Sequence, residues 1–381
     1  MDALTTPSNW QRVRLEDICE IVKGQQINKI SLNNTDKYPV INGGIDFLGY
    51  TNKFNVSKNT IAISEGGTCG YVRFMTSNFW SGGHNYSLQK ISNKVNNLCL
   101  YHILKSYEKD IMKLGVGSGL KNIQLKALKD FEIPLPPLNE QIAIANILSD
   151  LDHYLCSLDA LILKKESVKK ALSFELLSQR KRLKGFNQNW QKVKVKDFGI
   201  IITGSTPLTQ ISEYWNGTIS WITPTDINDN KDIFNSERKI TQKGLDTIRM
   251  IPKNSVLVTC IASIGKNAIL RVNGACNQQI NAIIPNKDFN ADFIYYLMEN
   301  NKQYLLGKAG VTATYIISKQ VFEEIDFFVP KDLNEQIAIA NILSGLNHEI
   351  ISLKNKKRQF ENIKKALNHD LMSAKIRVLN K

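Results

Sequence analysis

The feature that most constrains this chain is an internal repeat. The twelve residues LNEQIAIANILS occur at Leu138–Ser149 and again at Leu333–Ser344, 195 positions later. A second frame repeats upstream of each copy, as NWQRVRLEDI at Asn9 and NWQKVKVKDF at Asn189. Because similar sequences fold alike, repetition on this scale predicts two similar halves.

Each half has the same order of segments: the NWQ frame, a variable region, a strand marked by proline and a long helix. Prolines in FEIPLPPLNEQ and FFVPKDLNEQ end the strand, because proline cannot continue a ladder. Asn139 and Asn334 then suit the N-cap of the helix, and the Glu after each is favourable in the first turn. We expect the first helix to run from Asn139 to about Lys184, a rod of roughly 65–70 Å.

The two variable regions, residues 9–138 and 189–333, share little beyond their pattern. NTIAISEGGTCGYVRFM at Asn59 and NSVLVTCIASIGKNAIL at Asn254 both predict a strand, a tight glycine turn and a return strand. Nearly identical frames around different inserts indicate fixed scaffolding that holds two different recognition units.

Both predicted helices carry apolar residues at a 4-3 spacing, with a few polar breaks, which is typical of a coiled coil. The seam comprises Leu151, Leu155, Leu158, Ile162, Leu172, Leu176, Leu346, Ile350, Leu353, Phe360, Leu367 and Leu371. Neither helix can bury its own seam, so we expect the two to pack on each other, antiparallel, with a globular domain at each end. The alternatives are that each helix packs on its own domain or pairs with a second chain.

These patterns predict an α+β protein with a pseudo-two-fold internal repeat, in which two mixed α/β domains are joined by two long antiparallel helices. We expect domains at residues 1–138 and 186–333 and helices at residues 139–185 and 334–381. No run of about 18 apolar residues and no basic, apolar leader is present. We therefore expect a cytoplasmic chain with no membrane partner.

The charge balance points to a polyanion. The chain has 49 Lys and Arg against 35 Asp and Glu, and its net charge of +14 favours nucleic acid, with a solvated basic surface as the alternative. The six cysteines and five histidines show no metal-ligand spacing. Nucleotide-binding glycine loops, a methyltransferase NPP-aromatic tetrapeptide and a nuclease-like carboxylate cluster are also missing. We expect a binding and assembly protein that is not an enzyme, with no catalytic residue and no metal site.

The repeated frame resembles the specificity subunit of type I restriction–modification systems. The residues that carry the resemblance are the two NWQ frames, IPLPPLNEQIAIANILSDLD at Ile133 and FVPKDLNEQIAIANILSGLN at Phe328. In the second half GSTP at Gly204, YWNGTISWIT at Tyr214 and NQQINAIIPN at Asn277 are also similar, with WSGGHNYSLQ at Trp80 a weaker counterpart. The resemblance covers nearly the whole chain.

The resemblance implies that each variable region is a target recognition domain for one half of a split, asymmetric sequence in double-stranded DNA. It implies that the helices are central and distal spacers, which fix the gap between the half-sites. The implied partners are two modification subunits, which methylate adenine with S-adenosylmethionine, and restriction subunits that use ATP and Mg. No cofactor is then expected on this chain. The alternative is a non-catalytic coiled-coil scaffold whose two globular heads bind proteins or glycans.

Base recognition needs side chains that pair with base edges, such as Arg with guanine and Asn or Gln with adenine. Candidates from glycine-rich or polar stretches are Lys23, Gln25, Gln26, Arg73, Asn85, Lys121, Asn122, Ser205, Thr206, Thr223, Asp226, Lys266, Gln278 and Gln279. A structural role in a turn is the alternative for each, and Gln278 and Gln279 also fit a buried strand. For Glu140, Gln141, Glu335 and Gln336, at the helix starts, we expect scaffold or modification-subunit contacts.

Overall fold

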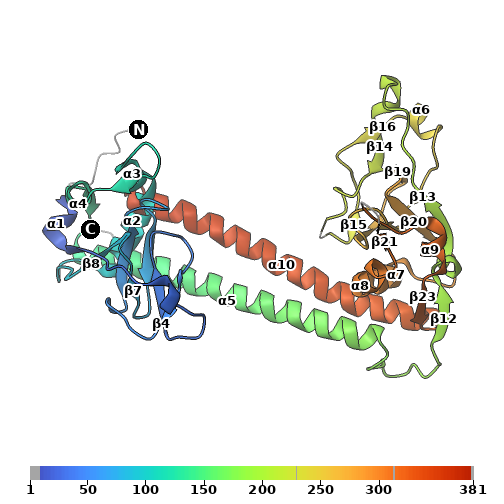
Figure 1. Ribbon diagram of the computed structural model, residues 1–381, viewed down its shortest axis with the longest axis horizontal. Coiled ribbons are helices and arrows are strands. Elements are labelled where there is room, and N and C mark those ends of the chain that lie inside the picture. Colours follow the sequence, from blue (N-terminus) through green and yellow to red (C-terminus); the bar gives the residue numbers. More distant parts are fainter. Residues whose placement is uncertain (1–8, 229, 312–313, 379–381) are drawn as a thin grey trace. The chain divides into compact units, whose positions relative to one another are not determined.

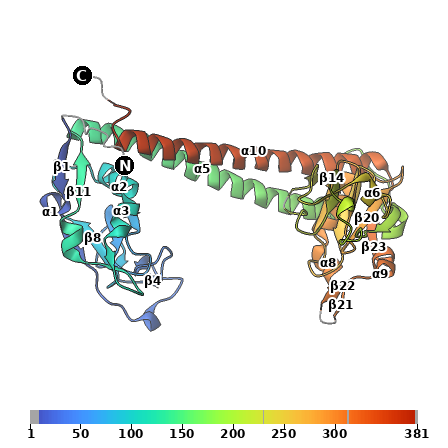
Figure 2. The ribbon, with the colours of Figure 1, turned by 90° about the horizontal axis from the view of Figure 1, so that it is seen from above.

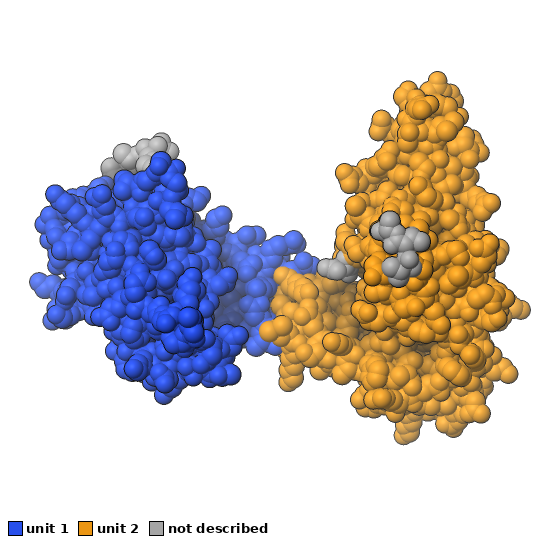
Figure 3. All heavy atoms as spheres, in the orientation of Figure 1, with its two compact units in different colours: residues 1–160, 355–381 blue, residues 161–354 orange. Residues whose placement is uncertain are grey.

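The computed structural model describes residues 9–228, 230–311 and 314–378 of the chain. It divides into two compact units: unit 1 comprises residues 1–160 and 355–381, and unit 2 comprises residues 161–354 (Figure 3). Each unit contains one variable region and a part of both long helices, α5 (Leu138–Leu177) and α10 (Leu333–Met372) (Figure 1). No helix in the described part of the chain is long and apolar enough to cross a membrane.

Unit 1 is built on an antiparallel sheet in the order β2-β8-β5-β6. Its strands are β2 (Glu20–Lys23), β8 (Asn85–Gln89), β5 (Thr60–Ser64) and β6 (Val72–Met75). A second sheet in the order β4-β3-β7 contains β4 (Gly49–Thr51), β3 (Tyr38–Ile41) and β7 (Trp80–Ser81), with β3 and β7 parallel. The adjacent β5 and β6 confirm the strand, turn and return strand predicted from Asn59.

Short elements complete unit 1. Strand β1 (Gln11–Arg14) pairs antiparallel with β11 (Glu132–Leu135) beside the start of α5 (Figure 2). The remaining elements are α1 (Leu15–Ile18), η1 (Lys29–Ser31), α2 (Asn97–Ser106), α3 (Glu108–Lys113), β9 (Gly115–Val116), β10 (Asn122–Ile123) and α4 (Leu125–Lys129). Apolar residues of the main sheet, α2 and the ends of both long helices form one buried core.

Unit 2 repeats this topology, with one strand added at the edge of the main sheet. That sheet has the order β13-β20-β17-β18-β15, with β13 (Gly199–Thr203), β20 (Ile280–Pro285), β17 (Ser255–Thr259), β18 (Asn267–Leu270) and the added β15 (Asp232–Ile233). The second sheet contains β16 (Lys239–Ile240), β14 (Trp215–Ile222) and β19 (Gly274–Cys276). The antiparallel β17 and β18 confirm the second predicted hairpin, from Asn254.

The short elements of unit 2 match those of unit 1 except for α6, which is added. Strand β12 (Gln191–Lys194) pairs antiparallel with β23 (Asp326–Val329), and β21 (Gly310–Val311) pairs with β22 (Tyr315–Ile316). The helices are η2 (Val195–Phe198), η3 (Ser212–Tyr214), α6 (Gln242–Leu245), α7 (Ala291–Asn300), α8 (Lys302–Leu306) and α9 (Lys319–Glu324). The predicted α+β class and its internal repeat are therefore confirmed.

The two long helices pack on each other in antiparallel fashion, as predicted. In unit 1 the rings of Tyr154 and Phe360 meet at 4.7 Å, and Lys357 pairs with Asp159 at 2.7 Å. In unit 2 Lys165 pairs with Glu349 at 2.8 Å and Lys354 with Glu166 at 2.6 Å. Within each unit the residue numbers rise along one helix as they fall along the other, which defines the antiparallel direction.

The predicted seam is the face that the helices bury. None of its twelve residues is exposed, and Leu158, Ile162, Leu176, Ile350 and Leu371 are almost fully buried. The outer seam residues do more than pair the helices, because Leu371 joins the core of unit 1 and Leu176 joins the core of unit 2.

The helix boundaries differ from the prediction at both ends. Helices α5 and α10 begin at Leu138 and Leu333, so Asn139 and Asn334 lie inside the first turn and are not the N-caps. Before α10 the Asp332 carboxylate takes that role, accepting a hydrogen bond from the Asn334 N–H at 2.8 Å.

Helix α5 also ends at Leu177, well before Lys184, so its length is about 60 Å. Gln179 has a φ of 61°, a left-handed conformation that ends a helix, and Ala374 has a φ of 55° just after α10. The sequence periodicity could not show this change in the backbone.

A buried Glu–Arg–Trp cluster holds the start of each long helix. Glu140, at the start of α5, accepts two hydrogen bonds from the Arg377 guanidinium, at 2.7 and 3.0 Å, and one from Trp10 Nε1 at 3.2 Å. The Glu140 side chain is only 3% exposed. Arg377 follows α10, so the start of one helix is fastened to the segment after the other.

The same cluster occurs in unit 2, where Glu335 at the start of α10 binds Arg182, which follows α5. The Arg182 Nη2 lies 2.9 Å from Glu335 Oε2, and Trp190 Nε1 donates to Oε1 at 3.2 Å. The repeated NWQ and LNEQ frames therefore meet at these two clusters.

Removing the Glu140 carboxylate tests the strength of this fastening. We expect Glu140→Ala to lower the free energy of unfolding by about 3 kcal/mol, because it leaves a partly buried guanidinium unpaired and an indole N–H without its acceptor. Urea denaturation measures this. The control is Glu213→Ala, which breaks the exposed Glu213–Lys243 pair and should leave the midpoint unchanged. An unchanged midpoint for Glu140→Ala as well would show that the cluster does not hold the helix.

Candidate functional site

In unit 1, backbone hydrogen bonds draw several loops into one cluster at the ends of the sheet strands. The Gly24 N–H donates to the Asn85 carbonyl at 2.9 Å, and the Gln25 N–H donates to the Ser81 carbonyl at 2.8 Å. A Cβ on Gly24 would lie 2.1 Å from the Gly82 carbonyl oxygen, so only glycine permits this crossing. We call residues 24–26, 42–44, 65–67 and 81–85 the first loop cluster.

Unit 2 builds the same crossing from a different sequence. The Gly204 N–H donates to the Ile280 carbonyl at 3.0 Å, and the Ser205 N–H donates to the Cys276 carbonyl at 2.8 Å. A Cβ on Gly204 would lie 2.2 Å from the Asn277 carbonyl oxygen. We call residues 203–206, 222–226 and 276–279 the second loop cluster.

A tryptophan supports each crossing, and the sequence analysis did not identify this role. Trp80 Nε1 donates to the Gln25 carbonyl at 2.9 Å, and Trp221 Nε1 donates to the Ser205 carbonyl at 3.0 Å. An indole N–H that packs against protein needs an acceptor, but the sequence does not say which carbonyl supplies it. Both tryptophans act on the loop that carries the candidate side chains.

A carboxylate that the sequence analysis also missed organises the first loop cluster. Glu65 accepts hydrogen bonds from Lys23 Nζ at 2.7 Å and from the Tyr86 hydroxyl at 3.2 Å. Burial, followed by the Glu65 charge and hydrogen bond, raises the pKa of Tyr86 to about 12. Tyr86 therefore stays protonated and donates, and it holds Glu65 beside the exposed Lys23.

The structure gathers most unit 1 candidates at the first loop cluster. Gln25 and Gln26 are exposed in it, and the exposed Lys23 lies directly before it at the end of β2. The exposed Asn122, beside the exposed Lys121, reaches the cluster, since its Oδ1 lies 2.2 Å from where a Cβ on Gly66 would be.

Two unit 1 candidates differ from this pattern. Asn85 is 2% exposed, and its Oδ1 accepts the Gly43 N–H at 3.3 Å, so it supports the loops from inside and offers nothing to a base. Arg73 lies on β6 with its guanidinium 5.0 Å from the Phe47 ring centre and 5.4 Å from that of Tyr71, apart from the cluster.

In unit 2, six of the seven candidates lie in the second loop cluster. Thr206 Oγ1 donates to Gln278 Oε1 at 2.6 Å, which fixes the amide of an exposed glutamine. Gln278 and Gln279 precede β20, which begins at Ile280, so they are turn residues and not buried strand residues. Ser205 is half-buried, with its carbonyl held by Trp221.

Thr223 and Asp226 bond mainly to each other. Asp226 Oδ2 accepts the Thr223 N–H and Oγ1–H at 2.8 Å each, and Oδ1 accepts the Glu237 N–H at 2.9 Å. Both carboxylate oxygens therefore hold a turn. Lys266 is exposed but lies outside the cluster, at a pocket elsewhere in unit 2.

The four residues at the helix starts are buried in the chain itself. Glu140 and Glu335 form the clusters described above, and each neighbouring glutamine connects the helix to a loop. Gln141 accepts the Asn96 N–H at 2.7 Å and donates to the Pro136 carbonyl at 2.7 Å. Gln336 makes the equivalent bonds to Asn290 and Pro330, at 3.0 and 3.1 Å.

The two loop clusters thus share a backbone arrangement and differ in their side chains. The exposed side chains at the first are an ammonium, two glutamines and an asparagine, and those at the second are threonine hydroxyls and a glutamine amide. These groups match the donors and acceptors on base edges. In the described residues no group of three or more His, Cys, Asp or Glu is placed to hold a metal ion.

Comparisons with known proteins give the family of this chain. The sequence profile of the family described as "Type I restriction modification DNA specificity domain" matches residues 7–165 and 187–362. A putative type I specificity subunit of Mycoplasma genitalium is 38% identical over 156 residues, 40% of this chain and 41% of that protein. The chain thus matches less than half the length of this relative and of one from Mycoplasma pneumoniae, of which it covers 43%.

Other relatives match along the whole chain. The specificity subunit of the type I restriction enzyme MjaVIII of Methanocaldococcus jannaschii is 26% identical over 100% of this chain and 96% of its own length. Among solved structures, the S subunit of a type I restriction–modification system from M. genitalium has the same fold, with a TM-score of 0.70, 22% identity and 97% of each chain covered. Because the family profile matches most of the sequence in two copies, the chain belongs to the type I restriction modification DNA specificity domain family.

Proposed function

We propose that this chain is the non-catalytic DNA specificity subunit of a type I restriction–modification complex, and that it binds a bipartite, asymmetric target in double-stranded DNA. In this proposal the first loop cluster recognises one half of the target and the second recognises the other. Unit 1 and unit 2 then contain the two target recognition domains.

The observation that carries this proposal is the loop crossing built twice. The same backbone hydrogen bonds, at Gly24 and Gln25 and again at Gly204 and Ser205, support different exposed side chains. Base edges are distinguished by the donors and acceptors that approach them. Two equivalent positions with different polar groups therefore suit two different half-sites.

The proposed partners are two modification subunits and the restriction subunits of the complex. Methylation of adenine would take place on the modification subunits with S-adenosylmethionine, and ATP and Mg would act on the restriction subunits. The M. genitalium and M. jannaschii relatives are named as specificity subunits, which supports assembly of this kind. We propose that the paired α5 and α10 helices set the gap between the half-sites.

Methylation mapping tests the bipartite target. The chain is co-expressed with a modification subunit from the same locus in a host that lacks DNA methylation, and methylated adenines are mapped by long-read sequencing. We expect a split motif with a fixed gap of unspecified bases and one methylated adenine in each half. A continuous motif would contradict recognition by two clusters.

A single substitution tests the assignment of the second loop cluster. Because Thr206 fixes the Gln278 amide at an exposed position, we expect Gln278→Ala to weaken binding to the cognate site about tenfold. The mapped motif should be relaxed in one half only. Gln242→Ala, which removes an exposed glutamine of α6 outside the cluster, is the control. Relaxation in both halves, or in neither, would show that Gln278 does not recognise bases of one half-site.

Salt dependence separates DNA binding from the alternative of a scaffold with protein- or glycan-binding heads. A protein that contacts several phosphates displaces counterions, so its affinity falls steeply as salt rises. We expect the logarithm of the affinity for a cognate duplex to fall linearly with the logarithm of the salt concentration, with a slope of several units. A flat dependence would favour the scaffold.

A further inference from the structure

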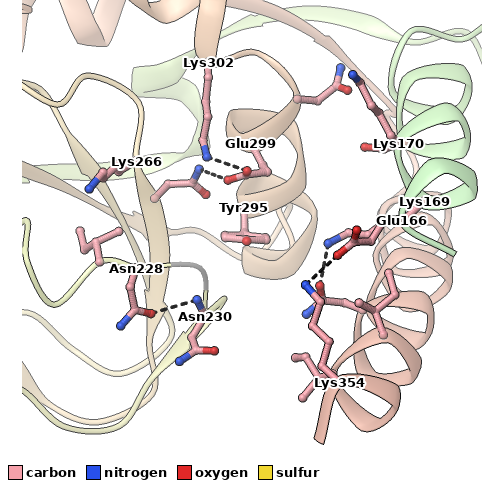
Figure 4. Close-up of a pocket in the computed structure, with 17 residues that line it drawn as sticks. Glu166, Lys169, Lys170, Asn228, Asn230, Lys266, Tyr295, Glu299, Lys302 and Lys354 are labelled. Carbon is pink, nitrogen blue, oxygen red and sulfur yellow. Dashed lines mark hydrogen bonds and ion pairs between the residues drawn. The ribbon is translucent and has the colours of Figure 1, made fainter. Parts of the chain in front are cut away.

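Unit 2 contains a lysine-rich pocket that the proposed base recognition does not use. Its volume is about 770 Å³, within the usual range for small-molecule sites. Residues of α5 and α10 line one side, and residues of α7 and α8 face them (Figure 4). The charged residues that line it are Lys169, Lys170, Lys266, Lys302, Lys354, Glu166 and Glu299.

The two carboxylates of the pocket are already paired. Glu166 binds Lys354 at 2.6 Å, and Glu299 binds Lys302 at 2.6 Å and accepts a hydrogen bond from Asn267 Nδ2 at 3.0 Å (Figure 4). In the described parts of the chain, no carboxylate lies within ion-pair distance of the other three lysines, which are Lys169, Lys170 and Lys266. Counted over the described residues that line it, the pocket has five lysines and two carboxylates, an excess of positive charge.

Lys169 is the least solvated of these three lysines. Its side chain is half-buried on α5, and its Nζ donates to the neutral Asn347 Oδ1 at 2.6 Å. Burial lowers the pKa of Lys169 below the ordinary value for lysine. The negative charges of Glu299 and Glu166 oppose this shift in part, and the positive charges of Lys354 and Lys302 add to it. An ammonium that has lost part of its hydration and contacts only a neutral amide is stabilised when an anion binds beside it.

The internal repeat supplies a comparison for this position. The residues 195 positions away from Lys169 and Asn347 are Lys364 and Asp152, and in unit 1 these two form an ion pair. The carboxylate that neutralises the lysine in unit 1 is thus an amide in unit 2. At the same offset of 195 positions, Lys266 of unit 2 corresponds to Tyr71 of unit 1, so unit 2 has one more lysine at this place.

We propose that this pocket of unit 2 binds a phosphate group, supplied either by a free nucleotide-sized anion or by the backbone of a DNA strand. Lysine binds phosphate as a point charge with rotatable donors, which suits three ammonium groups around one pocket. Binding of a free anion does not depend on the proposed function. Binding of a DNA phosphate rests on it and adds a backbone contact in unit 2.

Asn347→Asp is the sharpest test, because it gives unit 2 the carboxylate that unit 1 already has and so should preserve the fold. Calorimetric titration of the full chain with inorganic pyrophosphate, at physiological ionic strength, is the first measurement. We expect the wild type to bind, and Asn347→Asp and Lys170→Gln each to weaken binding about tenfold or more. Lys287→Gln removes an exposed lysine of unit 2 outside the pocket and should bind as the wild type does.

A second measurement identifies a DNA source. If the pocket holds a DNA phosphate, Lys170→Gln should lower the salt slope of duplex affinity by about one, and Lys287→Gln should not. Pyrophosphate binding that depends on Asn347 and Lys170, with an unchanged salt slope, supports the free-anion source even if the proposed DNA function fails.

The proposal is overturned if the wild type binds no pyrophosphate and the salt slope is unchanged. Equal binding by the wild type, Asn347→Asp and Lys170→Gln, again with an unchanged slope, would also overturn it. The control is the midpoint of thermal unfolding. We expect each variant to unfold at the same temperature as the wild type, so that a loss of binding is not a loss of fold.

Discussion

The buried carboxylates at the two helix starts determine how the rest of this chain is arranged. A carboxylate removed from water is costly unless a cation and further donors satisfy it. Glu140 and Glu335 meet this requirement with an arginine and an indole N–H each, and neither arginine comes from the helix that the glutamate begins. Arg182 and Arg377 lie 195 positions apart, the same spacing as the glutamates. Each repeat therefore supplies the arginine that the other repeat requires.

The contacts that hold the scaffold are distinct from the exposed side chains of the loop clusters. The glutamines next to the glutamates bind the loops before α2 and α7 through backbone groups, so the helix start also positions the globular part of its unit. At the loop clusters the crossing is again held by backbone N–H and carbonyl groups and by a glycine that excludes a Cβ. Backbone bonds do not specify neighbouring side chains. The exposed positions that follow each crossing, Gln26 and Thr206, can therefore carry different side chains on one backbone geometry.

The sequence was sufficient for the parts of the fold that depend on local pattern. The exact repeat, the 4-3 apolar spacing and the two strands around a glycine turn predicted the two halves, the paired helices and both hairpins, all of which are present. Contacts between residues far apart in sequence could not be predicted in this way. Nothing local to Arg377 indicates Glu140 as its partner, and nothing local to Trp221 indicates the Ser205 carbonyl. Asn85 shows the same limit. It is a polar residue close to a glycine pair in the sequence, but it is the first residue of β8 and is buried.

The lysine-rich pocket shows how the two halves of a repeat can differ in local charge while they keep the same scaffold. Asp and Asn have nearly the same size and shape, so exchanging Asp152 for its counterpart Asn347 leaves the packing between the helices intact. The electrostatic result is large, because a half-buried ammonium is paired with a full negative charge in unit 1 and with a dipole in unit 2. Attraction between charges falls slowly with distance in a partly desolvated site, whereas packing depends on contact. A single carboxylate-to-amide difference can therefore change which ligands a surface attracts without changing the scaffold. The loop clusters follow the same rule, since one backbone arrangement holds different side chains in the two units.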